Sequence, residues 1–279
     1  MKRLAISIAL VVFCVCALPS KADNVVVNTG LPDGKIATAS QPSSPGKTEI
    51  ESADDFVLTQ ATSIGGGTFI GLIPTGSTVE SVTVEFYRVF PADSTNPPNP
   101  QVVPTRMNSP SDVEFADRST TSSNLTFTTT ILNPQFTASN SVVNGISCSP
   151  GSPPNCFTGG EGAVTGQEVE FLFSIDPESL PADHYFFVPQ VELSNGTFLW
   201  LSAPKPIGAG GTPFLPDLQT WIRNSNLDPN WLRVGTDITR QGPFNASFSL
   251  TSVPEPSTLL LTLAGMLGLV LKRRKAALR

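Results

Sequence analysis

The chain has 279 residues, of which 39% are hydrophobic and 14% are charged, and its formal net charge is −6. Its 22 glycines and 26 prolines make up about 17% of the residues, which is too few for a collagen-like or low-complexity chain. The low charge content excludes a strongly charged disordered protein. Long apolar runs occur only at the two ends, which excludes a multispan membrane protein.

The charges are distributed unevenly along the chain. Eight of the 17 basic residues lie in the first 22 or the last eight positions, whereas all 23 acidic residues lie between Asp23 and Glu255. Residues 23–256 therefore carry nine basic and 23 acidic residues, a net charge of −14. Binding to nucleic acid requires Lys and Arg to neutralise phosphates. We therefore expect no nucleic-acid partner.

Residues 1–22 have the parts of a secretory signal peptide. Two basic residues precede the apolar run Leu4–Leu18, and Ser20-Lys21-Ala22 is a small-x-small cleavage site. We expect a signal helix that is removed by cleavage between Ala22 and Asp23, and export of the rest of the chain. An N-terminal membrane anchor is the alternative, although the apolar run is shorter than the roughly 20 residues of a spanning helix.

The body of the chain shows the pattern of β-strands. Polar and apolar residues alternate in four segments, which are 82–87, 125–131, 168–175 and 244–250. Val191–Trp200 predicts a two-residue hairpin, because Asn195-Gly196 at its centre tolerates the positive φ angles of a type I′ turn. No long amphipathic helix is evident, and residues 217–223 indicate a short turn. The pattern predicts an all-β fold, a single antiparallel β-sandwich (Ig-like or jelly-roll-like), over residues 23–252.

Three segments rich in Pro, Gly, Ser or Asn are expected to be loops, and they are 91–104, 148–162 and 203–216. The second contains Cys148 and Cys156, the two cysteines that remain after signal cleavage. Two nearby thiols in an oxidising compartment are expected to form a disulfide. Free thiols in a loop are the alternative. The absence of a Cys-x-x-Cys spacing argues against a redox-active pair.

The C-terminal segment 253–279 has three parts in a fixed order. The first part consists of Val253, Pro254, Glu255, Pro256, Ser257 and Thr258. Its prolines keep the chain extended and accessible to a protease. Residues 259–271 are uncharged and mainly apolar, which favours a short transmembrane helix. Residues 272–279 hold a basic cluster that favours the cytoplasmic side of the membrane.

This tail resembles the PEP-CTERM sorting signal of Gram-negative bacteria. The resemblance rests on the Pro254-Glu255-Pro256 triplet, the Ser257-Thr258 pair, the apolar stretch and the closing Lys/Arg cluster. It implies an exosortase, a membrane cysteine protease-transpeptidase, as the partner that removes the tail near the motif. It also implies export across the inner membrane, transient anchoring in that membrane, and a final location at the cell surface or in an exopolysaccharide or biofilm matrix. A permanent tail anchor with a proline-rich stalk is the alternative.

Candidates for nucleophilic, nucleotide or zinc chemistry are few in the body. His184 is the only histidine, and a Ser-His-Asp triad would need Asp183 or Asp176 to orient it. No Gly-x-Ser-x-Gly elbow supplies the nucleophile. Gly46-Lys47-Thr48 ends like a phosphate-binding loop but lacks its first glycine. With one histidine and two cysteines expected to pair, we predict neither a metal site nor a cofactor.

Carboxylates offer two further hypotheses. Asp54 and Asp55, or Glu168 and Glu170, would supply the pair that a glycoside hydrolase needs. A solvated strand face explains the second pair equally well. Calcium favours hard oxygen ligands, and the candidates for it are Asp54, Asp55, Asp112, Glu114 and Asp117. No complete calcium-loop motif joins them.

Three tryptophans, Trp200, Trp221 and Trp231, lie in the C-terminal half of the chain. Their rings would either stack on sugars or fill the core, and burial of large aromatic area favours the core. The sequence thus predicts a non-enzymatic protein with a structural or interaction role, sorted through its tail. A carbohydrate-binding module of an exopolysaccharide matrix is the alternative, and an extracellular hydrolase is the less favoured one.

Overall fold

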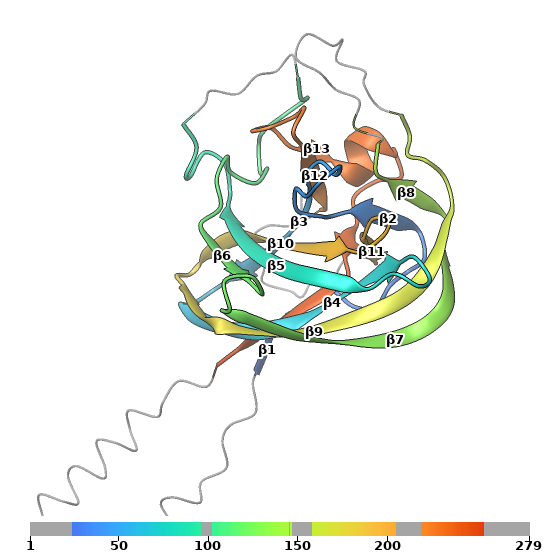
Figure 1. Ribbon diagram of the computed structural model, residues 1–279. Helices are drawn as coiled ribbons and strands as arrows, with labels where there is room; N and C mark the ends of the chain where they lie inside the picture. Colours follow the sequence, from blue (N-terminus) through green and yellow to red (C-terminus); the bar gives the residue numbers. More distant parts are fainter. Residues whose placement is uncertain (1–23, 96–101, 145, 147–157, 205–218, 254–279) are drawn as a thin grey trace, which may run out of the picture. The chain divides into compact units, whose positions relative to one another are not determined.

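The computed structural model describes residues 24–95, 102–144, 146, 158–204 and 219–253. Within them, Val25–Ser252 form one compact unit, whose regular secondary structure is almost entirely β-strand (Figure 1). The predicted all-β fold is therefore confirmed. The signal peptide, Cys148, Cys156, the sorting motif from Pro254 onward and both expected membrane-type helices lie outside the described residues. Among the residues that are described, no helix has the length and apolar character needed to cross a membrane.

Two sheets make up the unit. The six-stranded sheet has the order β13 (Leu232–Arg233), β12 (Trp221–Asn224), β3 (Ile50–Leu58), β10 (Asp183–Leu193), β5 (Val79–Arg88) and β6 (Ala116–Ser119). The main path of the nine-stranded sheet is β1 (Asn24–Asn28), β15 (Phe248–Ser252), β4 (Thr62–Ile73), β11 (Leu199–Ala203), β2 (Ile36–Ala39) and β8 (Asn140–Val142).

Three more strands extend the nine-stranded sheet beside this path. β9 (Val164–Leu180) pairs with β4, β7 (Leu125–Ala138) pairs with β9, and β14 (Asn245–Ala246) pairs with β11. β4–β9, β7–β9 and β10–β5 are antiparallel pairs, whereas β2 and β8 run parallel. One π-helical turn, η1 (Val234–Ile238), follows β13.

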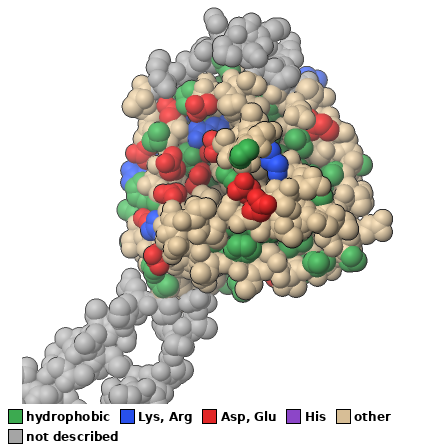
Figure 2. Space-filling view, in the orientation of Figure 1, with side chains coloured by type: hydrophobic (Ala, Val, Ile, Leu, Met, Phe, Trp, Pro, Cys, Tyr) green, Lys and Arg blue, Asp and Glu red, His purple; other side chains and the backbone are tan. Residues whose placement is uncertain are grey.

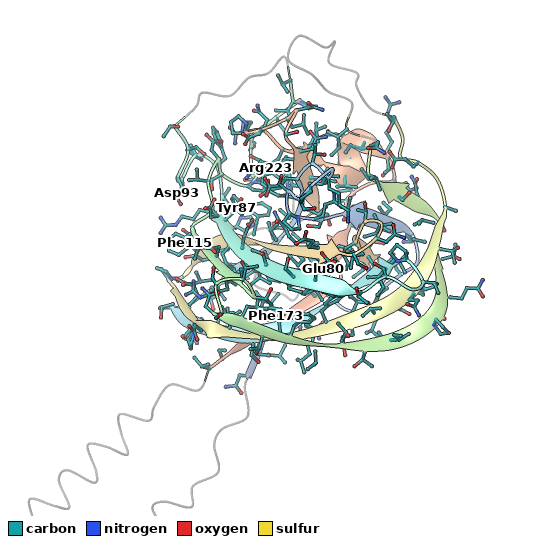
Figure 3. The ribbon with its side chains drawn as sticks, in the orientation of Figure 1. Glu80, Tyr87, Asp93, Phe115, Phe173 and Arg223 are labelled. Atoms are coloured by element: carbon teal, nitrogen blue, oxygen red, sulfur yellow. The ribbon has the colours of Figure 1, made fainter. Side chains whose placement is uncertain are left out.

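The two sheets share a core of aromatic side chains. On β9, Phe171 and Phe173 are buried and Leu172 between them is 54% exposed, because successive residues of a strand point to opposite faces. Phe173 (labelled in Figure 3) stacks on Phe187 of the other sheet with 5.7 Å between ring centroids. Phe86 packs against Phe187 as well. The buried faces of both sheets therefore meet in one cluster.

The predicted alternation matches the observed strands. Residues 82–87 lie in β5, 125–131 in β7 and 168–175 in β9. Segment 244–250 forms β14 and β15, which are separated at Ser247. Two local predictions are wrong. The first concerns residues 221–223, where Trp221–Asn224 form β12 and pair with β3, so this part is a strand rather than a turn.

The hairpin predicted at Asn195-Gly196 is the second wrong prediction. A type I′ turn needs two consecutive positive φ angles, and only Gly196 has one, at 75°. β10 before the turn belongs to the six-stranded sheet and β11 after it to the nine-stranded sheet. The chain crosses between sheets because Val191 and Trp200 both reach the shared core. Lys47 Nζ supports the crossing by donating to the carbonyl oxygens of Leu193 and Gly196 at 2.7 and 2.9 Å.

The aromatic core generates a first prediction. Phe173→Ala should lower the free energy of unfolding by about 3–5 kcal/mol, because it leaves a cavity against Phe187. Leu172→Ala, one residue away on the exposed face, should change it by no more than about 0.5 kcal/mol. Chemical denaturation of the exported protein measures both. Equal losses for the two variants would contradict the described packing.

Candidate functional site

Asp54 and Asp55 lie in the middle of β3 and point to opposite faces of the six-stranded sheet. Asp55 Oδ2 lies 2.7 Å from His184 Nε2 on β10, and its Oδ1 accepts a 3.0 Å hydrogen bond from the backbone N–H of Gln219. Asp54 accepts hydrogen bonds from the Thr220 hydroxyl at 3.0 Å and from the backbone N–H of Ala246. The two carboxylates thus bind β3 to three other segments of the chain.

The partner of the histidine differs from the sequence prediction. Asp183 accepts from the backbone N–H of His184 at 2.8 Å, whereas the carboxylate at the imidazole is Asp55. Burial raises the pKa of Asp54 well above its usual range, and the neighbouring Asp55 raises it further. Burial also raises the pKa of Asp55, although the hydrogen bond from His184 opposes this. Asp54, Asp55 and His184 are at most 7% exposed, and a catalytic group must reach its substrate. We interpret this cluster as structural.

A second buried polar cluster lies on the face of the same sheet that carries Tyr87. Arg223 on β12 donates to Glu51 on β3 from Nε to Oε2 and from Nη2 to Oε1, the latter at 3.0 Å. The Tyr87 hydroxyl on β5 donates to Glu51 Oε1 at 2.7 Å and accepts from Arg223 Nη2 at 2.9 Å. Figure 3 labels Tyr87 and Arg223, whose strands β5 and β12 flank β10 and β3 in the sheet. The Arg223 guanidinium also lies 4.4 Å from the ring centroid of Trp231.

Glu85 joins this cluster at its more exposed side. Its Oε2 lies 3.3 Å from the Tyr87 hydroxyl. Burial raises the pKa of Glu85 well above its usual range, and the negative charges of Glu51, Glu49 and Glu114 add to the increase. Figure 2 shows acidic side chains gathered on the left of this view, with basic side chains among them. Paired carboxylates are also a feature of glycoside hydrolases, but here the Tyr87 hydroxyl donates to Glu51 and lies between Glu51 and Glu85.

A further ion pair extends the buried cluster. Arg106 Nη2 lies 2.5 Å from Asp112 Oδ1, and both side chains are buried. Arg223 Nη1 donates to the backbone carbonyl of Asp112 at 3.0 Å. The Asp112 carboxylate is therefore already paired with the guanidinium of Arg106. The described residues contain no group of three or more His, Cys, Asp or Glu side chains that could hold a metal ion, so they do not bring together the calcium candidates Asp54, Asp55, Asp112, Glu114 and Asp117.

The tryptophans are buried, which corrects the hypothesis that they stack on sugars. Trp200, Trp221 and Trp231 are 0%, 1% and 0% exposed. Trp200 Nε1 donates to the carbonyl of Ser247 at 2.9 Å, and Trp231 Nε1 donates to that of Ser111 at 3.1 Å. Core packing, the other interpretation of these residues, is what the structure supports.

Glu168 and Glu170 lie on the outer face of β9. Val169 between them is 1% exposed and belongs to the core. Glu168 is opposite Leu72 and Glu170 is opposite Ile70 on β4. This placement fits a solvated strand face. Sequence reasoning missed the Glu51–Tyr87–Arg223 cluster, because its residues come from three strands that are far apart in the sequence.

The buried ion pair generates a second prediction. Glu51→Gln should lower the free energy of unfolding by about 3–5 kcal/mol, because Arg223 then keeps a buried charge without its counter-ion. The double variant Glu51→Gln/Arg223→Met should lose less than the sum of the two single variants, by about 0.5–3 kcal/mol. Denaturation of all four proteins closes the cycle. Strictly additive losses would show that the two side chains do not interact.

The raised pKa of Glu85 generates a third prediction. The folded protein holds this proton more tightly than the unfolded chain does. The resulting stability is complete below the ordinary glutamate pKa of about 4.3 and is lost as the pH rises through the raised pKa. From about pH 5 to about pH 8, Glu85→Gln should therefore lose less unfolding free energy than the unmodified protein. The pKa of Asp54 is also raised, but Asp54 is present in both proteins and therefore contributes equally to both pH profiles. Parallel pH profiles would contradict the prediction.

Comparison with known proteins adds information on the tail only. The family model of the PEP-CTERM protein-sorting motif matches residues 252–275. No curated protein and no solved structure matches the chain. The matched segment includes Glu255 and the prolines on either side of it, which are the residues that carry the resemblance in the sequence. The chain therefore carries a PEP-CTERM protein-sorting motif, which implies export and processing by an exosortase at the membrane.

Proposed function

We propose that the mature protein is a non-enzymatic structural or interaction protein of the cell surface or extracellular matrix, released there when an exosortase removes its tail. The observation that carries the proposal is the position of the motif. β15 ends at Ser252, and only Val253 separates it from Pro254. Cleavage near the motif would therefore leave every strand of the described unit intact.

The buried polar clusters support the non-enzymatic part of the proposal. Asp54, Asp55 and His184 hold together β3, β10 and the segments around Gln219 and Ala246. Glu51 and Arg223 hold β3 to β12. Asp54, Asp55 and His184 are among the carboxylate and imidazole groups considered for hydrolysis, and each of them has a structural partner. A rigid domain, held at several points, suits a protein displayed outside the cell.

A carbohydrate-binding role is the second candidate function. A cavity on the outer face of the nine-stranded sheet favours it, and none of the three tryptophans lines this cavity. Glu170, one of the carboxylates considered for hydrolysis, does line it. The binding role therefore needs different residues from those that the sequence indicates.

The sorting step generates a fourth prediction. Glu255→Ala in the native host should leave the tail uncut, because the variant lacks the only charged residue of the motif. The intact mass of protein from the membrane and from the medium measures cleavage directly. The unmodified protein should have a mass that corresponds to a start at Asp23 and an end within residues 254–258.

Glu80→Ala is the matched control, because Glu80 is an exposed glutamate outside the motif (Figure 3). This variant should be cleaved like the unmodified protein. Normal cleavage of Glu255→Ala would contradict the proposed sorting role. Retention of residues through Arg279 on every unmodified molecule would instead indicate a permanent anchor.

A further inference from the structure

A cavity of about 210 Å³ opens where β1, β15, β4 and β9 lie next to one another, near the bottom of the view in Figure 1. Its lining includes Asn28 and Leu31 from the end of β1 and the segment after it, Thr68 and Ile70 from β4, Glu170 from β9 and Ser249 from β15. It thus combines an amide, two hydroxyls, a carboxylate and two aliphatic side chains. Among the residues that the structure describes, none of those lining the cavity is basic.

The wall of the cavity is fixed to the sheet by several hydrogen bonds. The Thr29 hydroxyl donates to the carbonyl of Ala246 at 2.6 Å and accepts from the backbone N–H of Phe248 at 2.8 Å. The Ser247 hydroxyl donates to the carbonyl of Gly30 at 2.7 Å. Because these bonds hold the segment after β1 on β14 and β15, the cavity is formed before any ligand arrives. Preformed sites lose less entropy on binding.

The floor of the cavity follows from the register of the strands. Thr68 on β4 is opposite Ser249 on β15, and their hydroxyl oxygens are 2.8 Å apart. Two residues further along β4, Ile70 is 3% exposed and lies opposite Glu170. Leu31 adds a 73% exposed aliphatic side chain. Hydroxyl groups and one exposed aliphatic side chain therefore line the same cavity.

This combination fits a sugar ring. A pyranose presents hydroxyl groups at its edge and C–H groups on its face, so it needs hydrogen-bonding groups next to apolar surface. Glu170 would accept hydroxyl protons in charge-assisted hydrogen bonds, and the exposed side chain of Leu31 would contact the C–H face. The volume lies below the roughly 300–1,000 Å³ of pockets for drug-sized ligands, so it suits one ring rather than several.

Charge excludes one class of sugars. The lining contributes a carboxylate without a basic residue, and residues 23–256 carry a net charge of −14. An anionic sugar such as a uronate would be repelled by this field. We propose that the cavity binds a single neutral hexose unit of a glycan. The inference rests on the proposed surface or matrix location, where the exported domain meets glycans.

The test measures binding of the exported protein, recovered from its host, to two sets of oligosaccharides at equal concentration. One set contains neutral glucose, galactose and mannose oligomers, and the other contains uronate oligomers. Isothermal titration calorimetry should detect binding to at least one neutral oligomer and none to the uronates. Glu170→Gln and Thr68→Val should each weaken this binding by about tenfold or more, because the first removes the charge that strengthens the hydrogen bonds at Glu170 and the second removes the hydroxyl of Thr68.

Glu168→Gln is the matched control, since Glu168 lies on the same face of β9 but outside the lining. It should bind like the unmodified protein. Circular dichroism spectra and melting temperatures of the three variants should match those of the unmodified protein. Absence of binding to every neutral oligomer, equal binding of uronates, or equal effects of Glu168→Gln and Glu170→Gln would overturn the inference.

The intact mass of the same preparation separates this inference from the proposed function. Cleaved protein that binds no neutral glycan would overturn the cavity assignment and leave the sorting role standing. Glycan binding that depends on Glu170, in a chain that keeps its tail, would support the cavity assignment and overturn the proposed release.

Discussion

Burial of β3 on both faces is the constraint on which the rest of the unit depends. Every residue of this strand except Val57 is buried, although Glu51, Asp54 and Asp55 are acidic. A buried charge is costly unless it is paired or hydrogen-bonded. Arg223, His184 and the backbone N–H groups of Gln219 and Ala246 meet this requirement. The order of β12, β3 and β10 and the return of the chain to β14 therefore follow from satisfying three carboxylates as much as from apolar burial.

The second covered face explains two of the three tryptophans, Trp221 and Trp231. A sandwich needs only one buried face on each sheet, yet the six-stranded sheet also buries Trp221, Trp231, Phe186 and Val188 on its other side. Arg223 contacts the ring of Trp231 there while it pairs with Glu51. The aromatic rings thus shield an ion pair from water, which strengthens its electrostatic attraction. Trp221 and Trp231 therefore belong to segments that cover this face and do not form a surface for ligands.

The sequence predicts what is local and misses what depends on topology. The alternation in β5, β7 and β9 is a property of consecutive residues, so it is visible without knowledge of the partners. Asp55 and His184 are 129 residues apart, and only the pairing of β3 with β10 brings them together. The turn at Gly196 has the residues of a hairpin, but burial of Val191 and Trp200 in one core directs the chain to the other sheet. The cavity cannot be predicted from the sequence for the same reason, because Asn28, Thr68 and Glu170 come from three separate strands.

The contrast between local pattern and topology also applies to function. The function of the tail can be predicted from its sequence, whereas a binding site in the body cannot. A sorting motif is read as an extended segment, so its order of residues is sufficient for recognition, and residues 252–275 match the family model. A binding site in a β-sandwich is a set of side chains on neighbouring strands, each chosen by register rather than by sequence spacing. The outer face of the nine-stranded sheet joins Ser249, Thr68, Ile70 and Glu170 through two registers. Hydroxyl, aliphatic and acidic groups on one fixed surface favour a neutral polyol over an anion, whatever protein displays them.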